Sequence, residues 1–341
     1  MAAAGRSNEP LVSIQDLTVQ FRTDRGWTTA VEGVSFDIGD GDCVGVVGES
    51  GSGKSVTALS MLRLHARGTS RFPTGRVLHA GRDLLTAPER ELRRIRGGDI
   101  AMVFQDPMSS LNPVLTICDQ ISETLRLHQG MSRPDARRRA IELLDLVRIA
   151  DAPRRVDEYP HRLSGGMRQR VMIAIAIACR PRLLIADEPT TALDVTIQAQ
   201  ILELLRDLRA ELGMAVMLIS HDLGVIAEFA RRVIVMYAGR VVEDAPVEVL
   251  FRKPLHPYTE GLMASMPSLD GADTATLYSI PGRIPDPDET IAGCRFGPRC
   301  SYAEPACSAV PPELVSVDGG HRVRCTPRTR TVTPTATGAR Q

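Results

Sequence analysis

The sequence predicts an α/β fold in which a parallel sheet carries a phosphate-binding loop. Apolar segments typical of buried strands alternate with helical stretches over residues 1–250, and this alternation favours a parallel sheet covered on both faces. A glycine-rich loop at residues 48–55 follows one such strand and opens a helix. A second apolar strand, at 183–186, ends in the carboxylate pair Asp187 and Glu188.

The composition bounds the class of protein. The chain has 341 residues, of which 43% are hydrophobic and 24% charged, so it is neither disordered nor fibrous. Its 41 Lys+Arg balance 41 Asp+Glu, which argues against a uniformly basic nucleic-acid binder. The longest apolar run, residues 171–179, is too short to span a bilayer, and the first residues lack the apolar core of a signal peptide. We therefore expect a cytoplasmic protein whose membrane role requires partner chains.

Hydrophobic periodicity gives the expected elements. A helix should open at Ser132, with Pro134 in its first turn, and 106–170 should be mostly helical. Residues 251–325 are rich in Pro, Gly and Cys and should form a small accessory region, whereas 326–341 contain no acidic residue and should be disordered. Further strands are expected at 12–21, 34–38, 43–47, 100–104 and 216–219, and further helices at 54–64 and 196–212.

The glycine-rich loop reads Gly-Glu-Ser-Gly-Ser-Gly-Lys-Ser and fits the spacing GxxxxGK[ST]. Its glycines let backbone N–H groups turn inward and hold phosphate oxygens. Lys54 is expected to reach the β- and γ-phosphates, and the Ser55 hydroxyl to hold Mg²⁺. The alternative, a Gly/Ser-rich turn or linker, is disfavoured by the strand–loop–helix context. The expected nucleotide-binding residues are Gly48, Ser50, Gly51, Gly53, Lys54, Ser55 and Val56.

The carboxylate pair complements this loop. A buried strand that ends in Asp187 would place that carboxylate beside Mg²⁺, and Glu188 would polarise a water molecule in line with the γ-phosphate. Taken alone, an Asp-Glu pair after an apolar run is usually a strand end that meets solvent. The phosphate loop in the same chain favours the catalytic interpretation.

A third motif, Leu-Ser-Gly-Gly-Met at 163–167, should open a helix just before the acidic strand. With it, residues 11–250 resemble the ATP-binding-cassette (ABC) ATPases. The resemblance implies a P-loop NTPase cassette over 1–250: a RecA-like parallel core, an antiparallel β subdomain and an inserted helical subdomain at about 106–170. It also implies that two cassettes work as a dimer. Ser164, Gly165 and Gly166 would then bind the γ-phosphate of ATP held by the opposite subunit, a task that suits a helix N-terminus.

Other roles follow only from this resemblance. Gln105 resembles the Q-loop glutamine that contacts Mg²⁺, which Ser55 and Asp187 would also hold. His221 resembles the switch histidine on the γ-phosphate, and Asp194 lies in a stretch that resembles the D-loop. Phe21 resembles the aromatic residue that stacks on adenine, and Trp27 is its rival because either ring could supply that face. The implied catalytic residues are Glu188, His221 and Gln105.

Five further stretches, 106–113, 159–161, 190–200, 236–239 and 254–259, resemble the oligopeptide/dipeptide/nickel importer ATPases. This chain departs from that family's usual pattern at two positions. Arg162 stands where the family more often has Glu or Gln, and Arg231 stands where it more often has Asp. The resemblance implies an ATPase that powers peptide import from the cytoplasmic face of the cell membrane. Its partners would be a second, different ATPase chain, two permeases and an extracytoplasmic solute-binding protein, with no nucleic acid. The alternatives are nickel or another small solute as cargo, or a non-transport ABC ATPase.

The chain has seven cysteines. We expect Cys43, Cys118 and Cys179 to pack as small hydrophobic side chains. A reducing cytosol disfavours disulfides, so the C-terminal cysteines could hold a [4Fe–4S] cluster or Zn²⁺, or remain unligated thiols. Some extensions of the resembled importer family are associated with an iron–sulfur cluster, which favours iron. The four candidate ligands are Cys294, Cys300, Cys307 and Cys325.

Polar residues near these cysteines could support such a site. His256 and His321 are weaker substitute ligands. Four arginines flank the cysteines and would offset the charge of their thiolates: Arg295, Arg299, Arg322 and Arg324.

Overall fold

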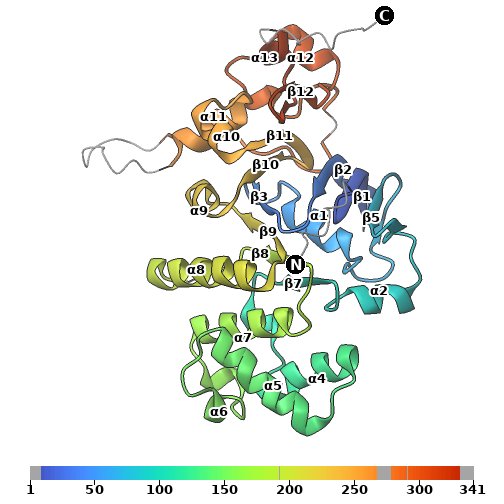
Figure 1. Cartoon of the computed structure of the whole chain (residues 1–341). Helices are drawn as coiled ribbons and strands as arrows, with labels where there is room; N and C mark the ends of the chain where they lie inside the picture. Colours follow the sequence, from blue (N-terminus) through green and yellow to red (C-terminus); the bar gives the residue numbers. More distant parts are fainter. Residues whose placement is uncertain (1–8, 192, 267–277, 290, 331–341) are drawn as a thin grey trace, which may run out of the picture. The chain divides into compact units, whose positions relative to one another are not determined.

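A computed structural model of the chain describes residues 9–191, 193–266, 278–289 and 291–330 (Figure 1). The chain divides into two compact units. The first comprises residues 1–13, 37–43 and 78–219, and the second comprises 14–36, 44–77 and 220–341.

The described residues form α-helices, β-strands and two 3-10 turns. The strands are β1 Val12–Thr23, β2 Gly26–Ile38, β3 Cys43–Val47, β4 Ser70–Arg71, β5 Arg76–His79, β6 Arg82–Asp83, β7 Ile100–Val103, β8 Leu183–Asp187, β9 Ala215–Ser220, β10 Arg232–Tyr237, β11 Arg240–Pro246, β12 Val315–Asp318 and β13 His321–Val323. The helices are α1 Lys54–Met61, α2 Glu89–Ile95, α3 Pro107–Ser110, α4 Ile117–Gln129, α5 Arg133–Leu146, α6 Ala152–Arg155, α7 Gly165–Ile177, α8 Val195–Leu212, α9 Leu223–Phe229, α10 Val247–Arg252, α11 Pro257–Ala264, α12 Pro305–Ala309 and α13 Thr326–Arg330. The 3-10 turns are η1 Pro160–Arg162 and η2 Gly297–Arg299.

In the first unit, β7, β8 and β9 run parallel, with Ile100 opposite Leu183 and Leu183 opposite Ala215. All five residues of β8 are buried, as expected for a strand covered on both faces. Helices α4 to α7 pack against one another: α4 contacts α5 and α7, and α5 contacts α6 and α7 (Figure 1). Helix α7 also contacts β7 and α8, so the same helix borders both the strands and the helical segment.

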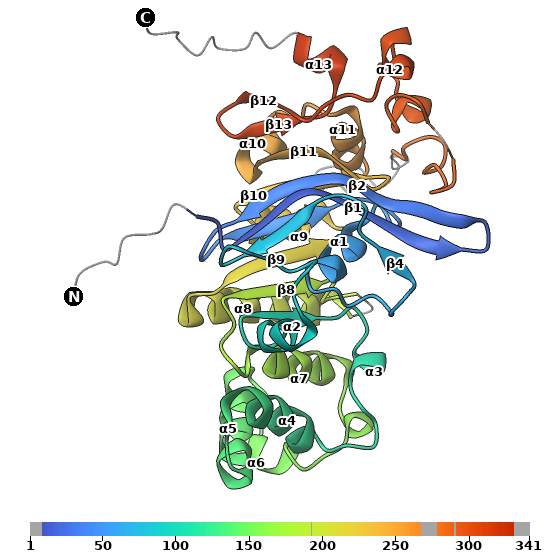
Figure 2. The ribbon, with the colours of Figure 1, turned by 90° about the vertical axis from the view of Figure 1, so that its right-hand side faces the viewer.

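In the second unit, β10 is parallel to β3 and antiparallel to β11. The hairpin of β12 and β13 extends this sheet, because β13 pairs with β11 through Glu243 opposite Val323. Strands β1 and β2 are hydrogen-bonded neighbours and form a long ribbon in Figure 2, and β4 pairs antiparallel with β1. The C-terminal extension is therefore part of a sheet that also contains the strand leading into the phosphate loop.

Most expected elements are present. Strand β3 spans the expected residues 43–47, and α5 begins after a Ser132 cap whose hydroxyl accepts from the Asp135 N–H. The expectation of disorder over 326–341 is wrong for 326–330, which form α13. There the Arg328 guanidinium pairs with Glu260 at 2.8 Å and lies 4.5 Å from the centre of the Tyr302 ring. These contacts give a basic segment a fixed partner, whereas residues 331–341 lie outside the described part of the chain.

None of the helices in the described residues is both long and apolar enough to cross a bilayer.

Candidate functional site

The phosphate loop connects β3 to α1 in the second unit. Gly48, its first residue, has a φ of 153°, which favours glycine. A Cβ at this position would lie 2.2 Å from the Met236 carbonyl oxygen of β10. The glycine is therefore required by close backbone packing, and it sets the path by which the loop leaves the sheet.

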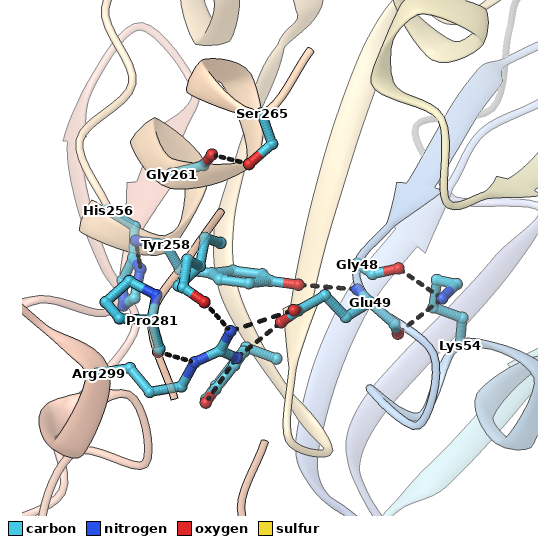
Figure 3. Close-up of polar contacts among 11 residues, drawn as sticks. Gly48, Glu49, Lys54, His256, Tyr258, Gly261, Ser265, Pro281 and Arg299 are labelled. Atoms are coloured by element: carbon cyan, nitrogen blue, oxygen red, sulfur yellow. Dashed lines mark hydrogen bonds and ion pairs between the residues drawn. The ribbon is translucent and has the colours of Figure 1, made fainter. Parts of the chain in front are cut away.

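Lys54 lies inside this loop. Its Nζ donates to the carbonyl oxygens of Gly48 at 2.7 Å and Glu49 at 3.0 Å (Figure 3), and the residue is 5% exposed. A buried ammonium is stable only when its donors are satisfied, and these loop carbonyls satisfy it. The only side-chain cation of the loop is thus held at the start of α1, where backbone N–H groups favour an anion.

The acidic strand places its carboxylates in different surroundings. Asp187 ends β8 and is 5% exposed. Glu188 follows with a φ of 45°, and its Oε2 accepts from Gln105 Nε2 at 3.0 Å and from Thr191 Oγ1 at 2.9 Å. The structure thus brings together Gln105 and Glu188, two of the three expected catalytic residues. The sequence alone does not predict Thr191 as a partner, although the residue lies in the 190–200 stretch that resembles the importer ATPases.

The Leu-Ser-Gly-Gly motif opens α7 in the first unit. The Ser164 hydroxyl accepts from the Met167 N–H at 3.4 Å, which makes Ser164 the N-cap of this helix. Gly166 lies against the start of α8, where a Cβ would come within 2.8 Å of Ile197 Cγ2. Asp194 caps α8 by accepting from the Ile197 N–H at 2.9 Å. The motif and Asp194 are therefore neighbours on adjoining helix starts.

The remaining expected nucleotide residues lie in the second unit. His221 is exposed and directly follows β9. The Phe21 ring lies edge-on to His65, with ring centres 4.9 Å apart. Trp27 is 39% exposed and has the Arg71 guanidinium 4.4 Å from its ring centre. The choice between Phe21 and Trp27 for adenine stays a prediction.

The four C-terminal cysteines line one small pocket, together with His256. The backbone joins two of them, since the Cys294 N–H donates to the Cys307 carbonyl at 2.7 Å. Burial raises the pKa of Cys294 and Cys300, and raises that of Cys325 to about 11. Among the described residues, no group of three or more Cys, His, Asp or Glu side chains is arranged to hold a metal ion.

The side chains expected to support these cysteines are engaged elsewhere. His321 Nε2 contacts the buried Glu243 carboxylate at 2.7 Å. Burial lowers the pKa of His256 to about 4, and its Nδ1 accepts from the Tyr258 N–H at 3.1 Å. Each flanking arginine binds a carboxylate or carbonyl from another element: Arg295 binds Glu32 and Ala238, Arg299 binds Glu49, Arg322 binds Asp244, and Arg324 binds Val241 and Pro312.

A strand, a glycine-rich loop with a buried lysine, and a helix, with an acidic pair at the end of a second buried strand, define a P-loop ATPase. Two family models match the chain. The model for ABC transporters matches residues 31–191, and the model for the oligopeptide/dipeptide transporter C-terminal region matches residues 242–307. The match of the extension separates this chain from cassettes that lack it.

Individual proteins support the same assignment. A Brucella abortus (strain 2308) protein named for peptide import and ATP binding is 60% identical over 319 residues, which are 94% of this chain and 95% of that protein. A similarly named Brucella melitensis biotype 1 protein is 53% identical over 329 residues, covering 94% of this chain and 97% of that protein. A dimeric ATP-binding cassette in a post-hydrolysis state with ADP and Pi is 31% identical, with a TM-score of 0.62 over 69% of this chain and 98% of that chain. This chain therefore belongs to the ABC transporter family, in its oligopeptide/dipeptide branch.

Proposed function

We propose that this chain hydrolyses ATP to power the import of peptides across the cytoplasmic membrane. The observation that carries the proposal is the combination of a phosphate loop that holds Lys54 with a Gln105–Glu188 pair at the end of a buried strand. The match of the C-terminal region and the names of the relatives support peptides as cargo, rather than nickel or another small solute.

The residues would divide the work as follows. Lys54 and the loop N–H groups would bind the β- and γ-phosphates, while Ser55, Gln105 and Asp187 would hold Mg²⁺. Glu188 would polarise the attacking water. Its two donors, Gln105 and Thr191, both bind Oε2, which holds that oxygen in place. His221 would contact the γ-phosphate, and Phe21 would stack on adenine.

Membership of this family supports the following assembly. Ser164, Gly165, Gly166 and Asp194 would act on ATP held by a second cassette, supplied by a different ATPase chain. Two permease chains would receive the motion, and an extracytoplasmic binding protein would deliver the peptide. The chain would lie peripherally on the cytoplasmic face of the membrane.

The proposal is tested by expressing the chain with its neighbouring transport genes and purifying the assembly from membranes. The chain should co-purify with two polytopic membrane proteins, and vesicles that contain the assembly should take up peptide only when ATP is supplied on the cassette side. An ATPase that purifies without polytopic partners, in an assembly that takes up no peptide, would contradict a transport role and favour a non-transport ABC ATPase.

We also propose that Cys294, Cys300, Cys307 and Cys325 hold a metal group, a [4Fe–4S] cluster or alternatively Zn²⁺. The four cysteines line one pocket, which supports the proposal. In the described residues no three or more possible ligands are arranged to hold a metal ion, so the cysteine side chains would have to move closer together on binding. Thiolates are the ligands of either group. Burial raises the pKa of the Cys294, Cys300 and Cys325 thiols. Because the bound form of a ligand is the thiolate, binding must release protons and should weaken as the pH falls.

Anaerobically purified protein should be brown and contain iron and sulfide, because iron–thiolate bonds absorb visible light whereas Zn²⁺ is colourless. Cys300→Ser should lower the metal content, and Cys118→Ser is the matched control because Cys118 lies in α4, outside the pocket. Stoichiometric zinc in colourless protein would replace iron but keep the site. Metal-free protein with four titrating thiols would contradict both versions.

A further inference from the structure

The C-terminal extension contacts the phosphate loop at Glu49, the residue after Gly48. Arg299 binds the Glu49 carboxylate with both ends of its guanidinium, through Nη1 to Oε2 at 2.8 Å and Nη2 to Oε1 at 3.2 Å (Figure 3). The Tyr258 hydroxyl accepts from the Glu49 N–H at 2.8 Å. Two separate elements of the extension, η2 and α11, therefore bind one residue of the loop.

The Arg299 guanidinium is also held by groups other than Glu49. Its Nε donates to the Pro281 carbonyl at 2.9 Å, and Nη2 donates to the Ile280 carbonyl at 3.2 Å. Its Nη1 also contacts the Tyr237 hydroxyl at 3.4 Å. The Arg299 side chain is 5% exposed, compared with 30% for that of Glu49. Because two backbone carbonyls and a tyrosine hydroxyl hold the guanidinium, its donors are already oriented to bind the carboxylate.

A second connection runs through the turn between β10 and β11. Arg295 donates to the Ala238 carbonyl and pairs with Glu32. The next residue, Gly239, donates its N–H to the Ser52 carbonyl of the phosphate loop at 2.9 Å. Arg295 and Arg299 are next in sequence to Cys294 and Cys300, so the cysteine segment is linked to the loop directly through Arg299 and indirectly through Arg295 and the β10–β11 turn.

Glu49 is also a partner of Lys54. Its carbonyl accepts from Lys54 Nζ at 3.0 Å, while its N–H is bound by Tyr258 and its carboxylate by Arg299. All three polar groups of Glu49 are thus engaged. A shift of this residue would move one of the two carbonyls that locate the lysine.

We propose that Arg299 and Tyr258 are positioning residues for ATP binding, which act through Glu49 to hold the phosphate loop and Lys54 in the conformation that receives phosphate. The inference rests on the proposed function, since it assigns two residues of the extension to the same ATP site. The alternative is that these contacts only stabilise the extension, in which case their loss would leave the affinity for ATP unchanged.

The test uses the full chain in its assembly and measures MgATP affinity at equilibrium, together with KM and kcat for hydrolysis. Arg299→Gln should weaken ATP binding roughly tenfold, the size of one charge-assisted hydrogen bond, and raise KM by a similar factor with little change in kcat. Arg299→Lys should recover part of the loss, because one donor and the charge remain. Tyr258→Phe keeps the ring but removes the acceptor for the Glu49 N–H, and should weaken binding several-fold.

Coupling to Glu49 is tested by a double-mutant cycle. If Arg299 acts through Glu49, Arg299→Gln combined with Glu49→Gln should be no worse than the weaker-binding single variant. Arg283→Gln is the matched control, because Arg283 belongs to the same extension but pairs with the exposed Asp286; its ATP affinity should equal that of the wild type. Tyr258→Phe keeps the test open if Arg299→Gln does not fold.

The outcomes are distinct. Wild-type ATP affinity in both Arg299→Gln and Tyr258→Phe, even with a lowered melting temperature, would overturn the inference and leave the proposed function intact. Additive losses in the cycle would also overturn it. A wild-type chain that binds no ATP would overturn the proposed function and this inference with it.

Discussion

Glu188→Gln is expected to abolish nearly all ATP hydrolysis while ATP binding is retained. The amide keeps an oxygen that can accept from Gln105 and Thr191, so the local hydrogen bonds survive. It removes the negative charge that would polarise water, and a general base contributes roughly 100- to 10,000-fold to a rate. We expect turnover to fall at least about 100-fold. Two quantities are measured: phosphate release by the assembly and MgATP binding at equilibrium. Because ATP is bound but not hydrolysed, the closed cassette dimer should accumulate.

Two controls make the Glu188 result specific. Glu203→Gln changes an exposed carboxylate on α8 that pairs with Arg148, and it should leave turnover unchanged. If the second ATPase chain has a competent site of its own, its equivalent residue must be changed in parallel. If the assembly in which both ATPase chains carry the substitution still turns over ATP at more than about a tenth of the wild-type rate, Glu188 is not the general base.

The elements that could be predicted from sequence are those with local signals. Strand β3 is a continuous apolar run between a Gly/Asp-rich turn and the glycine-rich loop, and its bounds were predicted correctly. Helix α5 was located by the Ser132 cap and by Pro134, which act within one helical turn. In both cases the residues that determine the structure are sequence neighbours.

The strand pair β10 and β11 was not predicted, and the reason is long-range. Glu243 and Asp244 lie in the middle of β11 and are 0% exposed, although two adjacent carboxylates normally indicate a solvent-exposed segment. His321 contacts Glu243, and Arg322 contacts Asp244, across 78 residues of sequence. Burial of these charges depends on partners that only the folded chain supplies.

The site shows the same limit. The phosphate loop and the acidic pair were found because their motifs are contiguous. Arg299 is adjacent in sequence to Cys300, but its guanidinium binds Glu49, 250 residues away in sequence. Tyr258 lies in the 254–259 stretch that resembles the importer ATPases, yet its contact with Glu49 spans 209 residues. Adjacency in sequence indicated the correct region for these residues but not what their side chains contact.

Lys54→Ala is expected to remove tight ATP binding, with an affinity loss of at least about 100-fold if the ammonium binds two phosphates. The change deletes the loop's only side-chain cation and also leaves the Gly48 and Glu49 carbonyls without its hydrogen bonds. The chain offers a matched control, because its other lysine, Lys253, is exposed after α10. Equilibrium titration with MgATP should give wild-type affinity for Lys253→Ala and no saturation for Lys54→Ala in the same concentration range. Retained tight binding in Lys54→Ala would place the nucleotide outside residues 48–55 and would remove the basis of the ATP site.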